Sequence, residues 1–230
     1  MNNIALIPAR GGSKRIKNKN IIEFEGIPII GHAIKLALET KVFDDVIVST
    51  DDERIRNISL EYGASVPWTR PVELADDFAT TSEVMNNAAE EILKIYPTTN
   101  NICCLYPATP LLDQEIILNA YDIFIMSKCD FTFPSIEHSI YRTFTLLDEN
   151  KVKLTFPEYS QSRTQDLGKT YLDSGQFYWG KIDAWLEKRE ILGPNSNTLV
   201  IPKYSAIDID SKEDFDLALT IFRNKRRETK

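Results

Sequence analysis

The sequence predicts an α/β fold with a mostly parallel sheet between two helical layers, for three reasons. Short apolar runs typical of buried strands alternate with longer segments whose apolar residues recur at helical spacing. A strand–helix–strand order favours parallel strands, because each helix returns the chain to the same end of the sheet. The chain has 230 residues, of which 43% are hydrophobic and 27% charged, and this suits a single globular domain.

The first half of the chain supplies most of this alternation. Pro28 falls in the first turn of an expected helix, and Gly63 follows the end of the next, positions that these residues favour. Thr81 or Ser82 is expected to cap a third helix. The expected elements are a strand at 4–7, a helix at 28–39, a strand at 46–48, a helix from 51 or 52 to about 62, a helix at 81–96 and a strand at 102–106.

The second half is richer in strands. Asp113 is expected to cap a helix that runs to about residue 127, and the last helix should cover 211–225. Strands are expected at 131–133, 176–179 and 198–201, and a hairpin at 141–147 and 151–156. We therefore expect one domain, residues 1–230, with a β-rich flap or dimerisation segment inserted at about 137–172.

Composition excludes several classes of protein. A net charge of −7 argues against general nucleic-acid binding. There is no apolar run of 18 residues and no secretion signal, so we expect a cytoplasmic protein without a membrane span. Cys103 and Cys104 should point to opposite faces of a strand, and with Cys129 they show no metal-binding spacing. His32 lies in an apolar helical pattern and is expected to be structural.

The most informative segment follows the first strand. Five of the ten residues from Arg10 to Lys19 are Arg or Lys, in a chain that is acidic overall. The Gly11–Gly12 pair would let backbone N–H groups approach phosphate oxygens. The segment matches neither the P-loop nor the dinucleotide-binding pattern. A triphosphate is the ligand that this loop favours, and a solvated surface turn is the alternative; Arg15 and Lys17 are the cations most easily read as merely solvated.

Other clusters should share an edge of the sheet with this loop, because ligands of such sheets bind beyond the carboxyl ends of the strands. They include the Ser-Thr-Asp-Asp turn at 49–52 and residues 106–110. Asp208 and Asp210 stand two apart in an extended segment and should point the same way. Paired carboxylates suit Mg²⁺, or Mn²⁺, together with substrate phosphates. The alternative is that these aspartates only cap the final helix.

Four motifs in this order resemble those of the sugar-acid cytidylyltransferases, the CMP-sialic acid synthetase family. They are residues 8–15 with Lys19 and Asn20, residues 48–51, residues 70–77 and residues 207–210. Within the family, residues 106–110, 162–167 and 173–179 are most similar to the branch that uses pseudaminic acid. Residues 106–110 and 172–175 differ from the patterns usual in the N-acetylneuraminate branch.

The resemblance implies a Rossmann-like nucleotide-diphospho-sugar transferase fold and a homodimer. It also implies that the anomeric hydroxyl of a nonulosonic acid attacks the α-phosphorus of CTP, giving a CMP-sugar and pyrophosphate. N-acetylneuraminate, legionaminate and 3-deoxy-manno-octulosonate remain alternative acids. A metal-dependent glycosyltransferase and a non-catalytic CTP sensor are alternatives of other classes.

The resemblance also implies roles for individual residues. Lys14, Lys19, Asp208 and Asp210 would be catalytic, and the two aspartates would bind the metal. The nucleotide would be held by Arg10, Gly11, Gly12, Ser13, Lys14, Lys19, Asn20, Arg70 and Ser82. The sugar would be held by Tyr106, Arg142, Arg163, Gln176 and Phe177, with the two arginines on its carboxylate.

Overall fold

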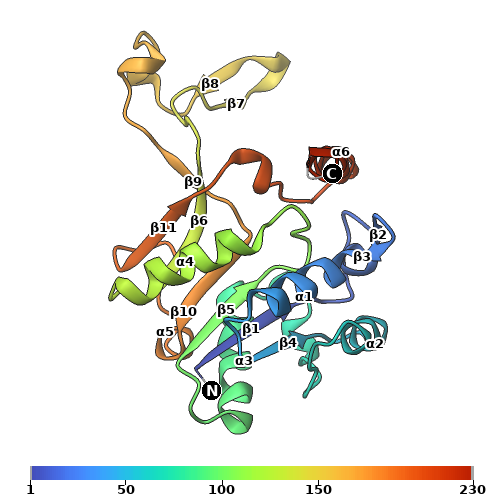
Figure 1. Ribbon diagram of the computed structural model, residues 1–230. Helices are drawn as coiled ribbons and strands as arrows, with labels where there is room; N and C mark the ends of the chain where they lie inside the picture. The colour runs from blue at the N-terminus through green and yellow to red at the C-terminus, as the bar shows by residue number, and fades with distance from the viewer. Residues whose placement is uncertain (1, 229–230) are drawn as a thin grey trace.

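The computed structural model describes residues 2–228, which build a central sheet of seven strands (Figure 1). The strand order is β11–β6–β10–β5–β1–β4, and β9 pairs with residues 135–137 at the end of β6. Five of these strands run in one direction: β1 (Asn3–Pro8), β4 (Asp45–Ser49), β5 (Asn101–Leu105), β6 (Phe131–Glu137) and β11 (Ser196–Val200). The sheet is therefore mostly parallel, as predicted. The opposed strands are β9 (Tyr171–Asp173) and β10 (Phe177–Lys181).

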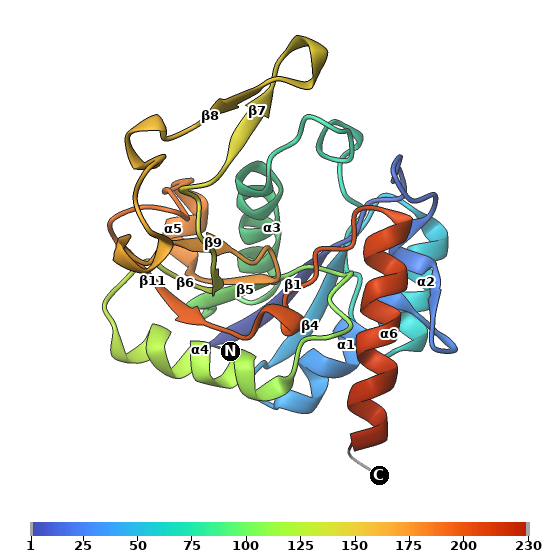
Figure 2. The ribbon, with the colours of Figure 1, turned by 90° about the horizontal axis from the view of Figure 1, so that it is seen from above.

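Helices cover both faces of the sheet, which gives the predicted three layers (Figure 2). Alternate residues of each strand enter opposite cores, so Cys103 packs with one helical layer and Cys104 with the other, as predicted. One layer holds α1 (Ile29–Thr40), α2 (Glu53–Glu61) and α4 (Gln114–Met126). The other layer holds α3 (Thr81–Ile95) and α5 (Ile182–Leu186).

A third, smaller core joins the two ends of the chain. Helix α6 (Lys212–Glu228) packs against the ribbon of β2 (Glu23–Phe24) and β3 (Ile27–Pro28), with Phe24, Ile209 and Ala218 at the contact. Arg223 forms an ion pair with Glu25 at 2.7 Å. His32 is structural here, because its Nε2 atom lies 2.8 Å from the carbonyl oxygen of Phe24. This core fixes the segment before α6 beside the loop that follows β1.

The β-rich excursion begins where β6 ends. Glu137 of β6 pairs with Tyr171 of β9, so the chain leaves and re-enters the sheet on adjacent strands. Between them, β7 (Phe144–Leu146) and β8 (Val152–Leu154) form the expected hairpin, shorter than predicted, which projects away from the sheet (Figure 1). Short 3-10 turns occur at Lys19–Ile21, Val72–Leu74, Asp148–Asn150, Pro157–Tyr159, Thr164–Asp166 and Lys203–Ser205.

Some local predictions were wrong. Thr80, rather than Thr81 or Ser82, caps α3: its hydroxyl accepts from the Glu83 N–H, and the Glu83 carboxylate accepts from the Thr80 N–H. Asp113 precedes α4 as predicted, but its carboxylate makes no capping bond and instead pairs with Lys225 at 2.9 Å.

In the described part of the chain, no helix is long and apolar enough to cross a bilayer.

Gly180 provides a test of the packing on β10. A Cβ at this position would lie 2.5 Å from Trp185 Nε1 and 2.7 Å from Phe131 Cε1, and both rings are fully buried. We expect Gly180→Ala to lower the free energy of unfolding by about 1–3 kcal/mol through overpacking. Chemical denaturation measures the change. The control is Gly12→Ala, where a Cβ meets open space; an equal loss in both variants would contradict the packing argument.

Candidate active site

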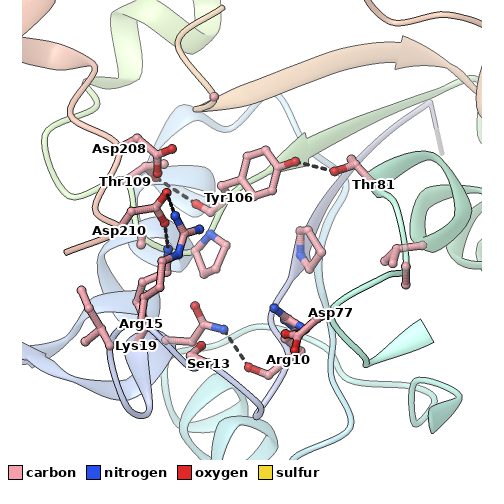
Figure 3. Close-up of a pocket in the computed structure, with 18 of the residues that line it drawn as sticks. Arg10, Ser13, Arg15, Lys19, Asp77, Thr81, Tyr106, Thr109, Asp208 and Asp210 are labelled. Carbon is pink, nitrogen blue, oxygen red and sulfur yellow. Dashed lines mark hydrogen bonds and ion pairs between the residues drawn. The ribbon is translucent and has the colours of Figure 1, made fainter. Parts of the chain in front are cut away.

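A cleft of about 480 Å³ opens at the carboxyl ends of the parallel strands. Its walls come from the loop after β1, from residues 70–84, from the turn after β5, and from residues near 175 and 208–210. Figure 3 shows Asp208, Asp210, Arg15 and Lys19 on one side of the cleft and Arg10 with Asp77 on another. The basic loop and the paired aspartates therefore share one cavity.

Direct contacts join these two segments. The Lys19 ammonium donates to the carbonyl oxygen of Ile209 at 2.8 Å and to Asp210 Oδ1 at 3.1 Å. Arg15 Nη1 lies 2.6 Å from the other oxygen of Asp210. Arg15, one of the two cations for which a merely solvated role was the readiest alternative, is among the residues that line the cleft. Its position in the basic loop was the available signal.

Asp208 differs from its neighbour. Within residues 2–228 no side chain forms an ion pair or hydrogen bond with its carboxylate, and Asp208 is an exposed residue of the cleft lining. Partial desolvation raises the pKa of this carboxyl, and the Asp210 charge raises it further, while Lys19 and Arg15 act in the opposite direction. A cation bound between the two aspartates would relieve this repulsion.

The donor set fits Mg²⁺. Among the described residues no cluster of three or more acidic, histidine or cysteine side chains is suited to a metal, so the protein offers two carboxylates. Mg²⁺ typically takes one or two carboxylates and completes its octahedron with water and substrate phosphates. An ion at Asp208 and Asp210 would face the cleft in which such phosphates could lie.

The opposite wall carries further cations. Arg10 Nη1 lies 2.8 Å from Asp77 Oδ1 and also donates to the carbonyl oxygen of Asp76. Lys14 pairs with the second oxygen of Asp77. Hydrogen bonds from Lys14 and Arg10 hold the pKa of the Asp77 carboxyl below its usual range. Asp77 belongs to a motif that carried the resemblance, but no role was predicted for it.

Arg70 is a buried cation. Only 4% of its surface is exposed, and its guanidinium donates to the Ser49 hydroxyl at 3.1 Å and to the Ser49 carbonyl oxygen at 2.5 Å. Burial lowers its pKa to about 10, so it remains charged at neutral pH, with the Asp51 charge acting against the shift. Both of its hydrogen bonds go to neutral groups. A buried cation of this kind on a cleft wall is suited to an anionic ligand.

A third wall is aromatic. The Tyr106 hydroxyl lies 2.6 Å from Thr81 Oγ1, and the Tyr178 hydroxyl donates to Asp173 Oδ2 at 2.6 Å. Burial raises the pKa of both phenols, so both are neutral and able to donate hydrogen bonds. Sequence reasoning assigned no ligand role to Thr81 or Tyr178. The alternation along β10 could have indicated Tyr178, since Phe177 and Trp179 face the core on the other side of the sheet.

Two predicted phosphate contacts have other partners. The Gly11 N–H donates to Asp51 Oδ1 at 3.0 Å. The Asn20 amide nitrogen donates to the Arg10 carbonyl oxygen at 2.9 Å, which ties the two ends of the basic loop together. Gly12 faces open space. The glycine pair therefore shapes the loop, and the Gly11 N–H is already in use.

Several predicted residues are not brought to the cleft, and their roles stay predictions. Phe177 is fully buried in the core, and the buried Gln176 donates to the Ser174 carbonyl oxygen at 3.0 Å. Arg142 donates to carbonyl oxygens of Ser160 and Ser162 within the excursion, and Arg163 pairs with Asp166. Ser82, Lys14, Gly11 and Gly12 are not among the lining residues, whereas the lining does include Arg10, Ser13, Lys19, Asn20, Arg70, Tyr106, Asp208 and Asp210.

Two proteins that are similar to this chain are both named as cytidylyltransferases. A relative named pseudaminic acid cytidylyltransferase, from Campylobacter jejuni, is 41% identical over 97% of this chain and 97% of its own length. A relative named N-acylneuraminate cytidylyltransferase, from Escherichia coli, is 30% identical over 98% of this chain and 53% of its own.

Solved structures agree on the fold. The CMP:2-keto-3-deoxy-manno-octonic acid synthetase complexed with CTP superposes with a TM-score of 0.72, over 98% of this chain and all of that one, at 16% identity. The predicted Rossmann-like α/β fold is thereby confirmed. The family model described as cytidylyltransferase matches residues 4–162. The chain, with its cationic loop, acidic pair and shared cleft, is therefore an enzyme that belongs to the cytidylyltransferase family.

Proposed function

We propose that this enzyme transfers CMP from CTP to the anomeric hydroxyl of a nonulosonic acid, with pseudaminic acid as the preferred substrate, and releases pyrophosphate. The observation that carries the proposal is the meeting of the basic loop and the Asp208–Asp210 pair in one cleft of a cytidylyltransferase. The choice of acid rests on the relative that carries pseudaminic acid in its name and shares 41% of its residues with this chain.

The cations of the cleft would hold the triphosphate. Arg10 and Lys19 line the cavity, Lys14 is paired with the lining residue Asp77, and Arg70 adds a buried charge. Phosphoryl transfer needs little covalent chemistry from the protein, so alignment and charge neutralisation supply most of the rate. Lys14 and Lys19 would stabilise the pyrophosphate as it leaves, and Ser13 and Asn20 would complete the nucleotide site.

Asp208 and Asp210 would hold Mg²⁺, with Mn²⁺ as the alternative ion. The bound ion would supply Lewis-acid stabilisation of charge on the phosphate oxygens. Lys19 and Arg15 each hold one oxygen of the Asp210 carboxylate, and both Asp208 and Asp210 line the cavity. On the aromatic wall, the neutral hydroxyls of Tyr106 and Thr81 would bind polar groups of the sugar.

A test of substrate and reaction uses one assay. The enzyme is incubated with CTP, Mg²⁺ and, separately, pseudaminic acid, legionaminic acid, N-acetylneuraminic acid and 3-deoxy-manno-octulosonic acid. We expect pyrophosphate release with the highest kcat/KM for pseudaminic acid. A different preferred acid would revise the substrate. Binding of CTP without pyrophosphate from any acid would favour the sensor, and consumption of a finished sugar nucleotide would favour the glycosyltransferase.

The acidic pair gives a second prediction. Asp210→Asn should lower kcat at least about a hundredfold, because it removes charge where the cation and phosphates would meet. The far-ultraviolet circular dichroism spectrum should stay unchanged. Asp216→Asn, on an exposed ion pair of α6 with Lys212, is the matched control and should keep wild-type turnover. Near-wild-type turnover of Asp210→Asn would refute the proposed role.

The excursion at 137–172 is proposed to be the dimerisation segment of a single catalytic domain. Phe144, Leu146 and Val152 lie together on one side of the hairpin, 51%, 66% and 58% exposed. A two-stranded hairpin alone is marginally stable, and exposed apolar rows of this kind mark protein contacts. A second copy of the chain would cover this row, and its excursion would bring Arg142 and Arg163 toward the neighbouring cleft.

The hairpin row predicts the oligomeric state. Wild type should sediment as a dimer, and Leu146→Glu should shift it toward monomer because a charge would be buried in the interface. Thr145→Glu is the control, since alternation places residue 145 on the opposite side of the hairpin. Sedimentation velocity measures both variants. A wild-type monomer, or a Leu146→Glu variant that remains dimeric, would contradict this assignment.

A further inference from the structure

The Ser-Thr-Asp-Asp turn after β4 has no place in the proposed reaction. The sequence places it at the same edge of the sheet as the basic loop, yet neither Asp51 nor Asp52 is among the described residues that line the cleft. Two carboxylates beside a polyphosphate would repel it unless a cation lay between them, as is proposed for Asp208 and Asp210. Both instead contact the basic loop at Gly11.

Two of these contacts converge on Gly11. The Gly11 N–H donates to Asp51 Oδ1 at 3.0 Å. The Asp52 side chain lies so close to the Gly11 Cα that a Cβ there would stand 2.6 Å from Asp52 Oδ2 and 2.8 Å from Asp52 Cβ. Glycine is therefore required at this point by the approach of the turn, while the next residue, Gly12, has open space beside it.

A third contact holds the far end of the loop. Arg54 is paired with Asp52 through Nη2 at 2.6 Å, and the same nitrogen donates to Asn18 Oδ1 at 3.2 Å. Asn18 has a left-handed backbone conformation with φ of 57° and stands immediately before Lys19. The Arg54 guanidinium and the N–H groups of Arg54 and Ile55 hold the pKa of Asp52 below its usual range, so it remains charged.

Helix capping accounts for part of this arrangement. Asp52 caps α2 by accepting from the N–H groups of Arg54 and Ile55, and that role needs no contact with the basic loop. Capping does not explain Asp51, whose carboxylate binds the loop backbone, or the reach of Arg54 to Asn18. The turn also carries Ser49, which holds the Arg70 guanidinium, so one segment contacts both groups of cations.

We infer that Asp51 and Asp52 are positioning residues that brace the basic loop from behind, Asp51 through the Gly11 N–H and Asp52 through Arg54 and Asn18. The brace fixes where Arg10 and Lys19 stand before a nucleotide arrives. The effect on CTP depends on the proposed function, whereas the effect on the loop itself does not. A misplacement of about 1 Å in such positioning groups can lower a rate by about a hundredfold.

The test compares Asp51→Ala, Asp51→Asn and Gly11→Ala with wild type in two measurements. The first is the KM for CTP and kcat in the pyrophosphate assay. The second, made without nucleotide, is the rate of tryptic cleavage after residues 10, 14, 15, 17 and 19, followed by mass spectrometry. Asp216→Ala, on the solvent side of α6, is the control for loss of a carboxylate far from the cleft.

We expect Asp51→Ala to raise the KM for CTP about tenfold with a smaller change in kcat, and to speed cleavage in the basic loop several-fold. Asp51→Asn keeps an acceptor oxygen for the Gly11 N–H and should restore most of both values. Gly11→Ala should loosen the loop as Asp51→Ala does, because the new Cβ forces Asp52 away, and it tests the brace if Asp51→Ala fails to fold. Asp216→Ala should match wild type.

Wild-type KM and cleavage in both Asp51→Ala and Gly11→Ala would overturn the inference. Equal impairment of Asp51→Asn and Asp51→Ala would also overturn it, because charge near Arg70 rather than the bond to Gly11 would then be responsible. If wild type releases no pyrophosphate with any acid, the proposed function fails. The cleavage rates still decide whether the turn braces the loop.

Discussion

The attraction between the basic loop and Asp210 is the interaction on which the cleft depends. Lys19 and Arg15 bind a carboxylate 191 and 195 positions further along the chain, so the first loop and the last extended segment close one cavity. The small core under α6 makes this possible, because Phe24 and Ile209 pack together and hold the two segments at contact distance. Without that core, residues 208–210 would have no fixed relation to the sheet.

The charged side chains of the cleft differ in how far neighbouring side chains neutralise them, and this difference indicates which ligand the cleft suits. Asp210 and Asp77 are each held by two cations, while Asp208 has none bonded to it in the described part of the chain. Arg70 is the corresponding cation: its guanidinium is buried and charged, and its hydrogen bonds go to neutral groups. An unneutralised carboxylate and an unneutralised guanidinium facing one cavity are the arrangement expected for a metal–nucleotide complex.

The fold could be predicted because its signals are local. Apolar alternation in 4–7 and 102–106 and the helical spacing in 28–39 determined which faces are buried, and the structure agrees. The direction of β10 could not be predicted, because Phe177 and Trp179 would be equally buried in a parallel strand. Elements of a few residues, such as β2, β3, β9 and α5, depend on packing against distant segments and leave little periodicity.

The cleft was only partly predictable, for a related reason. The residue types of Arg10, Lys19, Asp208 and Asp210 indicate their chemistry, and their place after strands indicates the edge of the sheet. The partners that orient them are common side chains in loops. The residue types of Asp77 and Thr81 do not distinguish them from nearby residues that are merely solvated. The different surroundings of Gln176 and Tyr178 depend on the register of β10.

The pair of salt bridges on Asp77 has a consequence for turnover. Arg10 and Lys14 are both paired with Asp77, so in the proposed reaction a triphosphate would have to displace that carboxylate to reach them. Binding would thus be an exchange of one anion for another, and its net driving force would be smaller than the number of cations suggests. The same exchange would run backwards as pyrophosphate departs, because Asp77 lies beside the two cations and would pair with them again. A cleft that supplies its own counter-anion in this way would bind a highly charged ligand without retaining its highly charged product.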